Sequence, residues 1–285
     1  MHPHQPARAD LRPRLRETLV RRRADQGLTL VELLIAMAIM GIVFVLVTNW
    51  QVSTLSISTR TNALSQRLSD LTDVTGYVGD RVRSAVRVRV ATSGMTVNSG
   101  TGNACSNERP CLAVVLPMPS ASGGINEYDL YTYRMEPRSV LNEDDRPDDD
   151  WANGTDVSPA VTSRVQVLRE YRTHSASTPA TCQATPAQFE SGSFVGTSAN
   201  VANCTAMRDL ASLGSVGSTL PYLVSDYLTP ANELKDVSGA NVPAFSLTSG
   251  AITLRFQSKF RVRGATQLLP IPPYALTVQA RNVAP

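Results

Sequence analysis

A run of twenty residues, Leu28 to Val47, contains a single ionisable side chain, Glu32. As an α-helix this segment is about 30 Å long at about 1.5 Å per residue, which matches the hydrocarbon thickness of a bilayer. A removable secretory signal has an apolar core of about 7–15 residues followed by a small-residue cleavage site, whereas this run is longer and its polar break comes first. The segment is therefore predicted to stay in the chain as a membrane-length helix.

The acid inside this helix indicates a function. Insertion scales put the cost of a comparable charged residue in a membrane helix at about 2.5–3.5 kcal/mol, so Glu32 is expected to have a partner. The alternative is an ordinary anchor whose acid lies near the membrane surface.

The segment Gly27-Leu28-Thr29-Leu30-Val31-Glu32 follows basic residues, and it resembles the leader junction of type IV pilins and pseudopilins. The resemblance implies that a prepilin peptidase, a membrane aspartic protease, cleaves between Gly27 and Leu28 and N-methylates Leu28. It also implies that Glu32 pairs with the methylated amino terminus of a neighbouring subunit in a filament. Leu28 replaces the commonest Phe, and Asn49 stands where major pilins often carry Pro; both departures point toward a minor subunit.

The positive charge of the chain lies in its first 27 residues. This leader has a net charge of +4, which leaves about −1 for the remainder of a +3 chain. Arg21, Arg22 and Arg23 precede the apolar run, so the positive-inside rule places the leader in the cytoplasm and the rest outside. A near-neutral exported part gives no electrostatic reason to predict nucleic-acid binding.

All four cysteines lie on the predicted exported side, where disulfides are permitted. They are Cys105, Cys111, Cys182 and Cys204. Of the three pairings, Cys105 with Cys111 and Cys182 with Cys204 closes two local loops without crossing, but the sequence does not choose rigorously among them. A zinc site is the alternative, although the chain has no C-x-x-C and His174 is its only histidine beyond the leader. If the exterior of the source cell is poorly oxidising, the cysteines are expected to be free buried thiols instead.

The apolar helix is predicted to continue well beyond the membrane, because no proline occurs between Pro13 and Pro110. Apolar residues then recur at steps of three and four, which predicts one buried face against a sheet. This stripe consists of Leu64, Leu68, Leu71, Val74, Val78, Val82 and Ala85. Gly76 and Gly79 weaken the last turns, so the helix is expected to end between Gly76 and Ala91.

Alternating or continuous apolar segments after the helix predict β-strands. They are Val86–Val90, Cys111–Val115, Glu127–Met135, Arg164–Tyr171, Ile252–Val262 and Tyr274–Ala280. The last two are expected to form an antiparallel hairpin with a long connection through Pro270–Pro273. The predicted fold class is α+β, with a long N-terminal helix packed on an antiparallel sheet, as in pilins.

Three polar stretches are predicted to be surface loops, Thr92–Glu108, Ser139–Pro159 and Ser175–Gly217, the last stapled by its two cysteines. The second carries an acid run that ends in Asp148, Asp149 and Asp150, a weak calcium candidate. The run lacks EF-hand spacing and Pro147 interrupts it, so a solvated loop is the favoured interpretation and no metal site is predicted.

No motif for catalysis or cofactor binding is present. The chain lacks G-x-S-x-G, a phosphate-binding Gly-rich loop and H-E-x-x-H. We therefore expect neither an enzyme nor a cofactor.

The predicted organisation is a cleaved leader (1–27), a transmembrane and polymerisation helix (28–48), its amphipathic continuation (49–85) and an exported β-rich domain (86–285). The resemblance implies a single-pass inner-membrane protein whose partners are the prepilin peptidase, membrane lipid, the inner-membrane assembly platform and other major and minor pilin subunits. A PilW-type minor pilin that primes pilus assembly near the tip is the favoured function. The alternatives are a J-type minor pseudopilin of type II secretion, a DNA-uptake pseudopilin, and a membrane-anchored adhesin.

Overall fold

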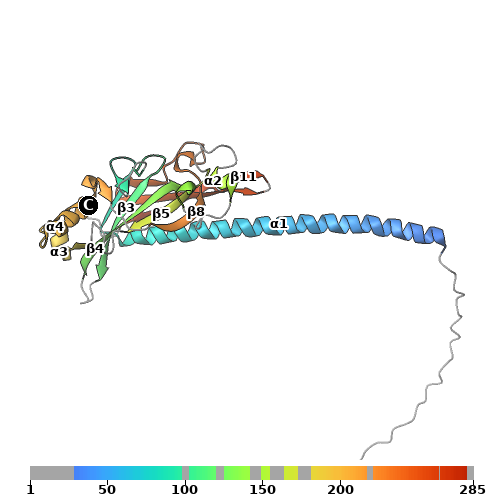
Figure 1. Cartoon of the computed structure of the whole chain (residues 1–285), viewed down its shortest axis with the longest axis horizontal. Helices are drawn as coiled ribbons and strands as arrows, with labels where there is room; N and C mark the ends of the chain where they lie inside the picture. The colour runs from blue at the N-terminus through green and yellow to red at the C-terminus, as the bar shows by residue number, and fades with distance from the viewer. Residues whose placement is uncertain are drawn as a thin grey trace, which may run out of the picture. The chain divides into compact units, whose positions relative to one another are not determined.

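The computed structural model describes residues 29–97, 103–119, 125–141, 149–154, 164–172, 181–216, 221–262 and 264–280. The chain divides into two compact units, residues 1–57 and residues 58–285. A long helix and a large antiparallel sheet dominate the described residues, which confirms the predicted α+β class (Figure 1).

Helix α1 spans Leu30–Ser84 and ends within the range predicted from the sequence. In the second unit it buries one face, formed by Leu71, Val74, Thr75, Val78, Gly79 and Val82. The predicted stripe was wrong at Leu68, which is 41% exposed, and Leu64 is only partly buried, because the fully buried face of α1 begins at Leu71.

The main sheet has the strand order β1-β3-β4-β5-β8-β10-β11, with β6 beside β4 and β9 beside β10, and every pair is antiparallel. The strands are β1 Arg87–Ala91, β3 Cys111–Pro119, β4 Ile125–Pro137, β5 Gln166–Arg172, β6 Cys182–Gln183, β8 Tyr222–Leu228, β9 Phe245–Thr248, β10 Ala251–Val262 and β11 Ala265–Gln279. A separate parallel pair joins β2 Thr96–Val97 to β7 Ser215–Val216. All six predicted strand segments overlap strands of the main sheet.

The short helices are α2 Asp150–Asn153, α3 Pro186–Ser191 and α4 Ser198–Arg208, with 3-10 turns at η1 Arg138–Val140, η3 Leu210–Ser212 and η4 Ala231–Glu233. All three short α-helices correct the sequence analysis, because α2 lies within the predicted surface loop Ser139–Pro159, and α3 and α4 lie within Ser175–Gly217. Thr185 begins α3 with a capping box to Gln188, and Thr197 caps α4. Polar composition hid these helices, although the T-x-x-Q spacing is a recognisable start signal.

The sheet separates two apolar cores. Leu112, Val114 and Leu116 of β3 face the core that contains α1, whereas Cys111, Ala113 and Val115 face the core that contains α3 and α4. Because both of its faces are buried, β3 is a continuous apolar run rather than an alternating one. On the second face, Phe189 of α3 stacks on Tyr128 of β4 with ring centroids 3.9 Å apart.

The predicted long connection between the last two strands was also wrong. Strand β11 begins at Ala265 and pairs with β10 from Val262 opposite Ala265 to Ala251 opposite Gln279, with a bulge between Phe256 and Ser258. Pro270, Pro272 and Pro273 therefore lie within the strand. Proline is tolerated there because residues 270–273 lie in the bulge, without paired residues in β10, and because β11 ends the sheet order and needs no second set of ladder bonds.

Candidate functional site

The acid at Glu32 caps the beginning of α1. Its Oε2 accepts hydrogen bonds from the Thr29 amide and the Thr29 hydroxyl, each at 3.0 Å. The Thr29 hydroxyl oxygen accepts in return from the Glu32 amide at 3.3 Å. This is a capping box, and it gives the carboxylate a partner within its own chain that the sequence analysis did not anticipate, although T-x-x-E is the spacing that signals one.

The second carboxylate oxygen of Glu32 is the chemically available one. Within the described part of the chain, Oε1 makes no hydrogen bond, and the residue is exposed. The positive end of the helix dipole favours a negative charge at this position. The arrangement can therefore cap its own helix through one oxygen and receive an external cation through the other.

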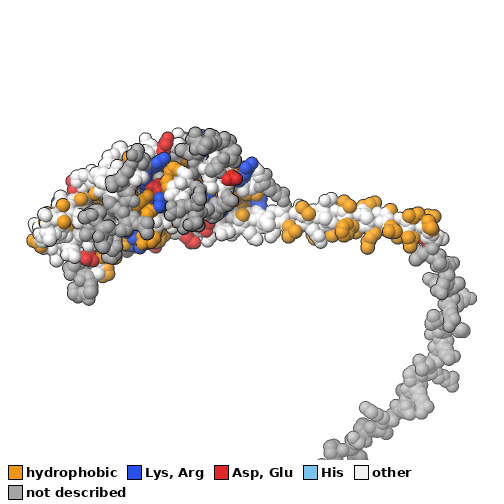
Figure 2. Space-filling model, in the orientation of Figure 1, with side chains coloured by type: hydrophobic (Ala, Val, Ile, Leu, Met, Phe, Trp, Pro, Cys, Tyr) orange, Lys and Arg blue, Asp and Glu red, His pale blue; other side chains and the backbone are white. Residues whose placement is uncertain are grey.

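Helix α1 continues from this cap as an exposed apolar surface. Between Leu30 and Val47 the large hydrophobic side chains are 44% to 75% exposed. Figure 2 shows them gathered along this part of the helix. By length and hydropathy α1 is the one helix among the described residues that could cross a membrane. A contiguous apolar surface of this size marks contact with lipid or with protein.

Gly27 and Leu28, the predicted cleavage and methylation positions, lie outside the described residues, which begin at Thr29. Cleavage there would make Thr29 the second residue of the mature chain. The new amino group would then lie one residue before the capping box. Both positions remain predictions from the sequence.

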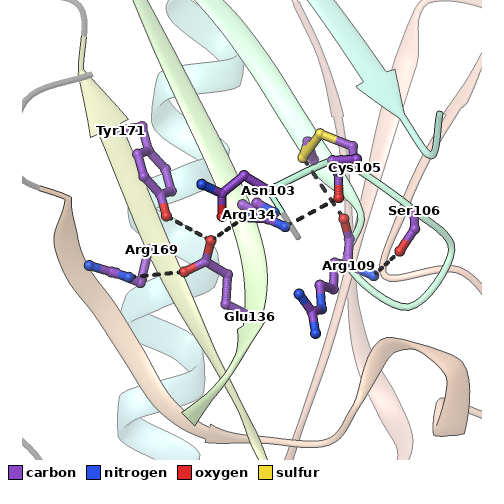
Figure 3. A network of polar contacts seen from close by, with 10 residues as sticks. Asn103, Cys105, Ser106, Arg109, Arg134, Glu136, Arg169 and Tyr171 are labelled. Atoms are coloured by element: carbon purple, nitrogen blue, oxygen red, sulfur yellow. Dashed lines mark hydrogen bonds and ion pairs between the residues drawn. A yellow bond between two sulfur atoms is a disulfide. The ribbon is translucent and has the colours of Figure 1, made fainter. Parts of the chain in front are cut away.

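Two disulfides join the cysteines in the local arrangement, Cys105 to Cys111 and Cys182 to Cys204. The first lies beside a buried polar network, shown in Figure 3. There the Glu136 carboxylate accepts hydrogen bonds from Arg134 at 2.6 Å, Arg169 at 3.1 Å and the Tyr171 hydroxyl at 2.7 Å.

Arg134 also donates to the Ala104 carbonyl, next to the first disulfide, at 3.2 Å. Burial, followed by the nearby Glu136 charge, raises the pKa of the Tyr171 hydroxyl, so this hydroxyl stays a donor even in alkaline solution. The network places two cations and one phenol around one buried acid, which ties β4 to β5. It fits a structural role.

The acid run takes part in structure where it is described. Asp149 caps α2 by accepting from the Ala152 amide at 3.1 Å, and it accepts from the Tyr227 hydroxyl at 2.8 Å. Asp150 is exposed in the first turn of α2. Asp148 and His174 lie outside the described residues, and the described residues contain no cluster of three or more His, Cys, Asp or Glu that could hold a metal.

Residues 22–48 match the family described as the prokaryotic N-terminal methylation motif. This confirms the resemblance to the type IV pilin and pseudopilin superfamily, in which the motif marks structural subunits processed by prepilin peptidase. The match and the apolar helix fit a single-pass anchor in the inner membrane. No curated protein and no solved structure matches the chain significantly, so the comparison assigns no subtype.

Proposed function

We propose that this chain is a minor pilin that helps initiate assembly of a type IV pilus, at or near its tip. The observation that carries the proposal is the Glu32 carboxylate, held by its own helix cap through Oε2, with Oε1 exposed at the start of an apolar helix. An anchor alone needs no such acid. A polymer subunit does, because the acid can attract the amino terminus of the next subunit.

The proposed sequence of events begins with prepilin peptidase. Cleavage after Gly27 creates an amino group on Leu28 that stays cationic after methylation. In the membrane, lipid surrounds the apolar half of α1, and the globular part lies on the periplasmic side. The assembly platform then brings the helix beside other major and minor subunits, where the new cation lies against the Glu32 of a neighbour. The pairing lowers the cost of burying both charges.

Two features support a minor subunit. Leu28 replaces the commonest first residue of the family, and α1 runs without interruption through Asn49, where major pilins often carry a helix-bending proline. The motif is shared with pseudopilins, so a minor pseudopilin of type II secretion is the second candidate and a DNA-uptake pseudopilin the third. Deleting the gene should abolish piliation in the first case, and should abolish export or DNA uptake with piliation intact in the others.

The charge of Glu32 is tested by Glu32→Gln. Glutamine keeps a carbonyl oxygen for the Thr29 cap but removes the charge, so a loss of function is not a loss of the cap. We expect incorporation into sheared filaments to fall by about tenfold or more, because removing one partner of a buried ion pair costs about 3–5 kcal/mol. Quantitative immunoblotting of filament and membrane fractions measures this.

Asp80→Asn is the matched control, since Asp80 is an exposed acid on the same helix, paired with Arg83 at 2.7 Å. It should be incorporated like the wild type. Undiminished incorporation of Glu32→Gln would contradict assembly through this charge. Absence of the wild-type protein from filaments would instead favour a membrane-anchored adhesin.

A further inference from the structure

An open groove of about 640 Å³ lies between α1 and β8 within residues 58–285. Its helix wall is formed by positions three or four residues apart, and hence on one face of α1: Arg67, Asp70, Asp73, Val74 and Tyr77. The opposite wall consists of Glu170 and Arg172 at the end of β5 and of residues 222–226 of β8. Neither the apolar segment Leu30–Val47 nor the disulfides contribute to it.

The wall formed by β8 is the edge of a strand. Five consecutive residues of β8, 222–226, line the groove. Successive side chains of a strand point to opposite faces, so a wall that includes every residue is formed by the backbone edge of the strand. One side of β8 pairs with β5, from Leu228 opposite Gln166 to Tyr222 opposite Glu170. On the other side, β10 meets β8 only where Ser258 lies opposite Leu228.

Within the described residues, the second backbone edge of residues 222–226 therefore pairs with no strand. Tyr222 and Leu223 are accordingly 53% and 46% exposed. An unpaired strand edge is a template for an added strand, and a groove between such an edge and a helix is a known way of binding extended peptides.

Tyr227, the residue that follows the groove lining of β8, contacts Arg67 of α1. Tyr227 has a φ of 58°, a left-handed conformation that is strained for a bulky side chain. Two guanidinium groups contact its ring, Arg67 at 4.2 Å and Arg138 at 4.8 Å from the centroid. These contacts connect the helix wall of the groove to the sheet.

The charges of the groove favour a basic occupant. Its lining carries four carboxylates and two guanidinium groups. Three carboxylates are paired inside the fold: Glu170 with Arg172 and Tyr77, Asp226 with Arg138, and Asp70 with Arg67. Asp73 is exposed and makes no ion pair or hydrogen bond within the described part of the chain. A lysine or arginine from outside would supply its missing partner.

We propose that this groove binds an extended segment of another polypeptide, which adds as a strand to the free edge of β8 and places a basic side chain near Asp73. The strand edge requires an occupant in the extended conformation, and the excess of carboxylates in the groove requires that the occupant carry a positive charge. The inference goes beyond the assembly role and does not depend on it, because the groove lies outside Leu30–Val47.

The first test uses the full chain in detergent micelles as bait for phage-displayed random octapeptides. We expect enrichment of sequences with Lys or Arg among alternating apolar residues. We also expect the enriched peptide, made synthetically, to slow amide hydrogen exchange in residues 222–226. No enrichment, enrichment of acidic sequences, or protection elsewhere in the chain would overturn the proposal.

The second test separates backbone pairing from side-chain attraction. Methylating alternate amide nitrogens of the synthetic peptide, on the edge that would pair with β8, should abolish binding, because it removes the donors of the added strand. Asp73→Asn should weaken binding of the unmodified peptide by about threefold, as for other exposed ion pairs. Asp80→Asn, on the same helix but outside the groove, should leave it unchanged. Equal binding of the methylated peptide, or equal effects of the two substitutions, would refute strand addition with charge recognition.

Discussion

The two halves of α1 belong to one uninterrupted helix but present opposite surfaces. From Leu30 to Val47 every residue is exposed and apolar side chains surround the helix. From Leu71 to Val82 a single stripe is buried, and Val78 and Val82 are fully inaccessible. The second half is stabilised by the fold of its own chain. The first half has no such partner among the described residues, and its apolar surface fits a membrane anchor.

This difference distinguishes residues that stabilise the fold of a single chain from residues that act in assembly. A side chain in the buried half contributes to the unfolding free energy of a single chain. A side chain in the exposed half contributes only when a membrane or a filament surrounds it. Paired substitutions in the two halves therefore test the comparison directly.

The largest effect on stability is expected for Leu71→Ala. Leu71 is 3% exposed against the sheet, and replacing a buried leucine by alanine costs about 2–5 kcal/mol. Leu46→Ala is the matched control, since Leu46 is 63% exposed. Urea unfolding of the purified protein in detergent, followed by tyrosine fluorescence of the globular part, should show the loss for Leu71→Ala alone. Equal losses would mean that the two halves are not energetically distinct.

A smaller effect is expected for two glycines in the buried half. Gly76→Ala should stabilise the protein by about 0.5–1 kcal/mol, because alanine favours the helix and its Cβ would meet nothing within 4 Å. Gly79→Ala should not, because its Cβ would lie 2.8 Å from a Leu276 methyl group. Thermal unfolding would rank them. A more stable Gly79→Ala variant would show that α1 is less closely packed on β11 than the structure indicates.

The smallest effect concerns alkaline pH. Burial, and then the hydrogen bond to Asp149, raises the pKa of Tyr227 from 10.0 to about 12. Between these values the unfolded chain has released the proton that the folded chain keeps, so the unfolding free energy falls as pH rises from 10 to 12. Tyr227→Phe should reduce this fall without abolishing it, since burial also raises the pKa of Tyr131 and Tyr171. An unchanged slope in pH-dependent unfolding would contradict the assignment.

Much of the fold could be predicted because it is encoded locally. The length of α1 follows from the absence of proline, its buried face from the three-and-four spacing, and β10 from its alternation. Strand β8 could not be found this way. Its sequence Tyr-Leu-Val-Ser-Asp-Tyr-Leu does not alternate between apolar and polar residues. Asp226 gains its partner Arg138 from a position 88 residues away.

The candidate site, like the fold, could be predicted from the sequence only in part. Glu32 was found because its cost in an apolar helix is visible in the sequence, although its Thr29 cap was overlooked. The groove was not foreseeable, since its walls come from distant segments, as in the contact of Tyr77 with Glu170 across 93 residues. Tertiary contacts of this kind leave no periodic signal.

The mature amino terminus is the most direct test of the central claim, which is that the apolar half of α1 is a processed assembly helix. Intact-mass and N-terminal peptide mass spectrometry of the native protein should find a chain that begins at Leu28 and carries one N-methyl group. A chain that retains residues 1–27, or that begins at another residue, would contradict the account.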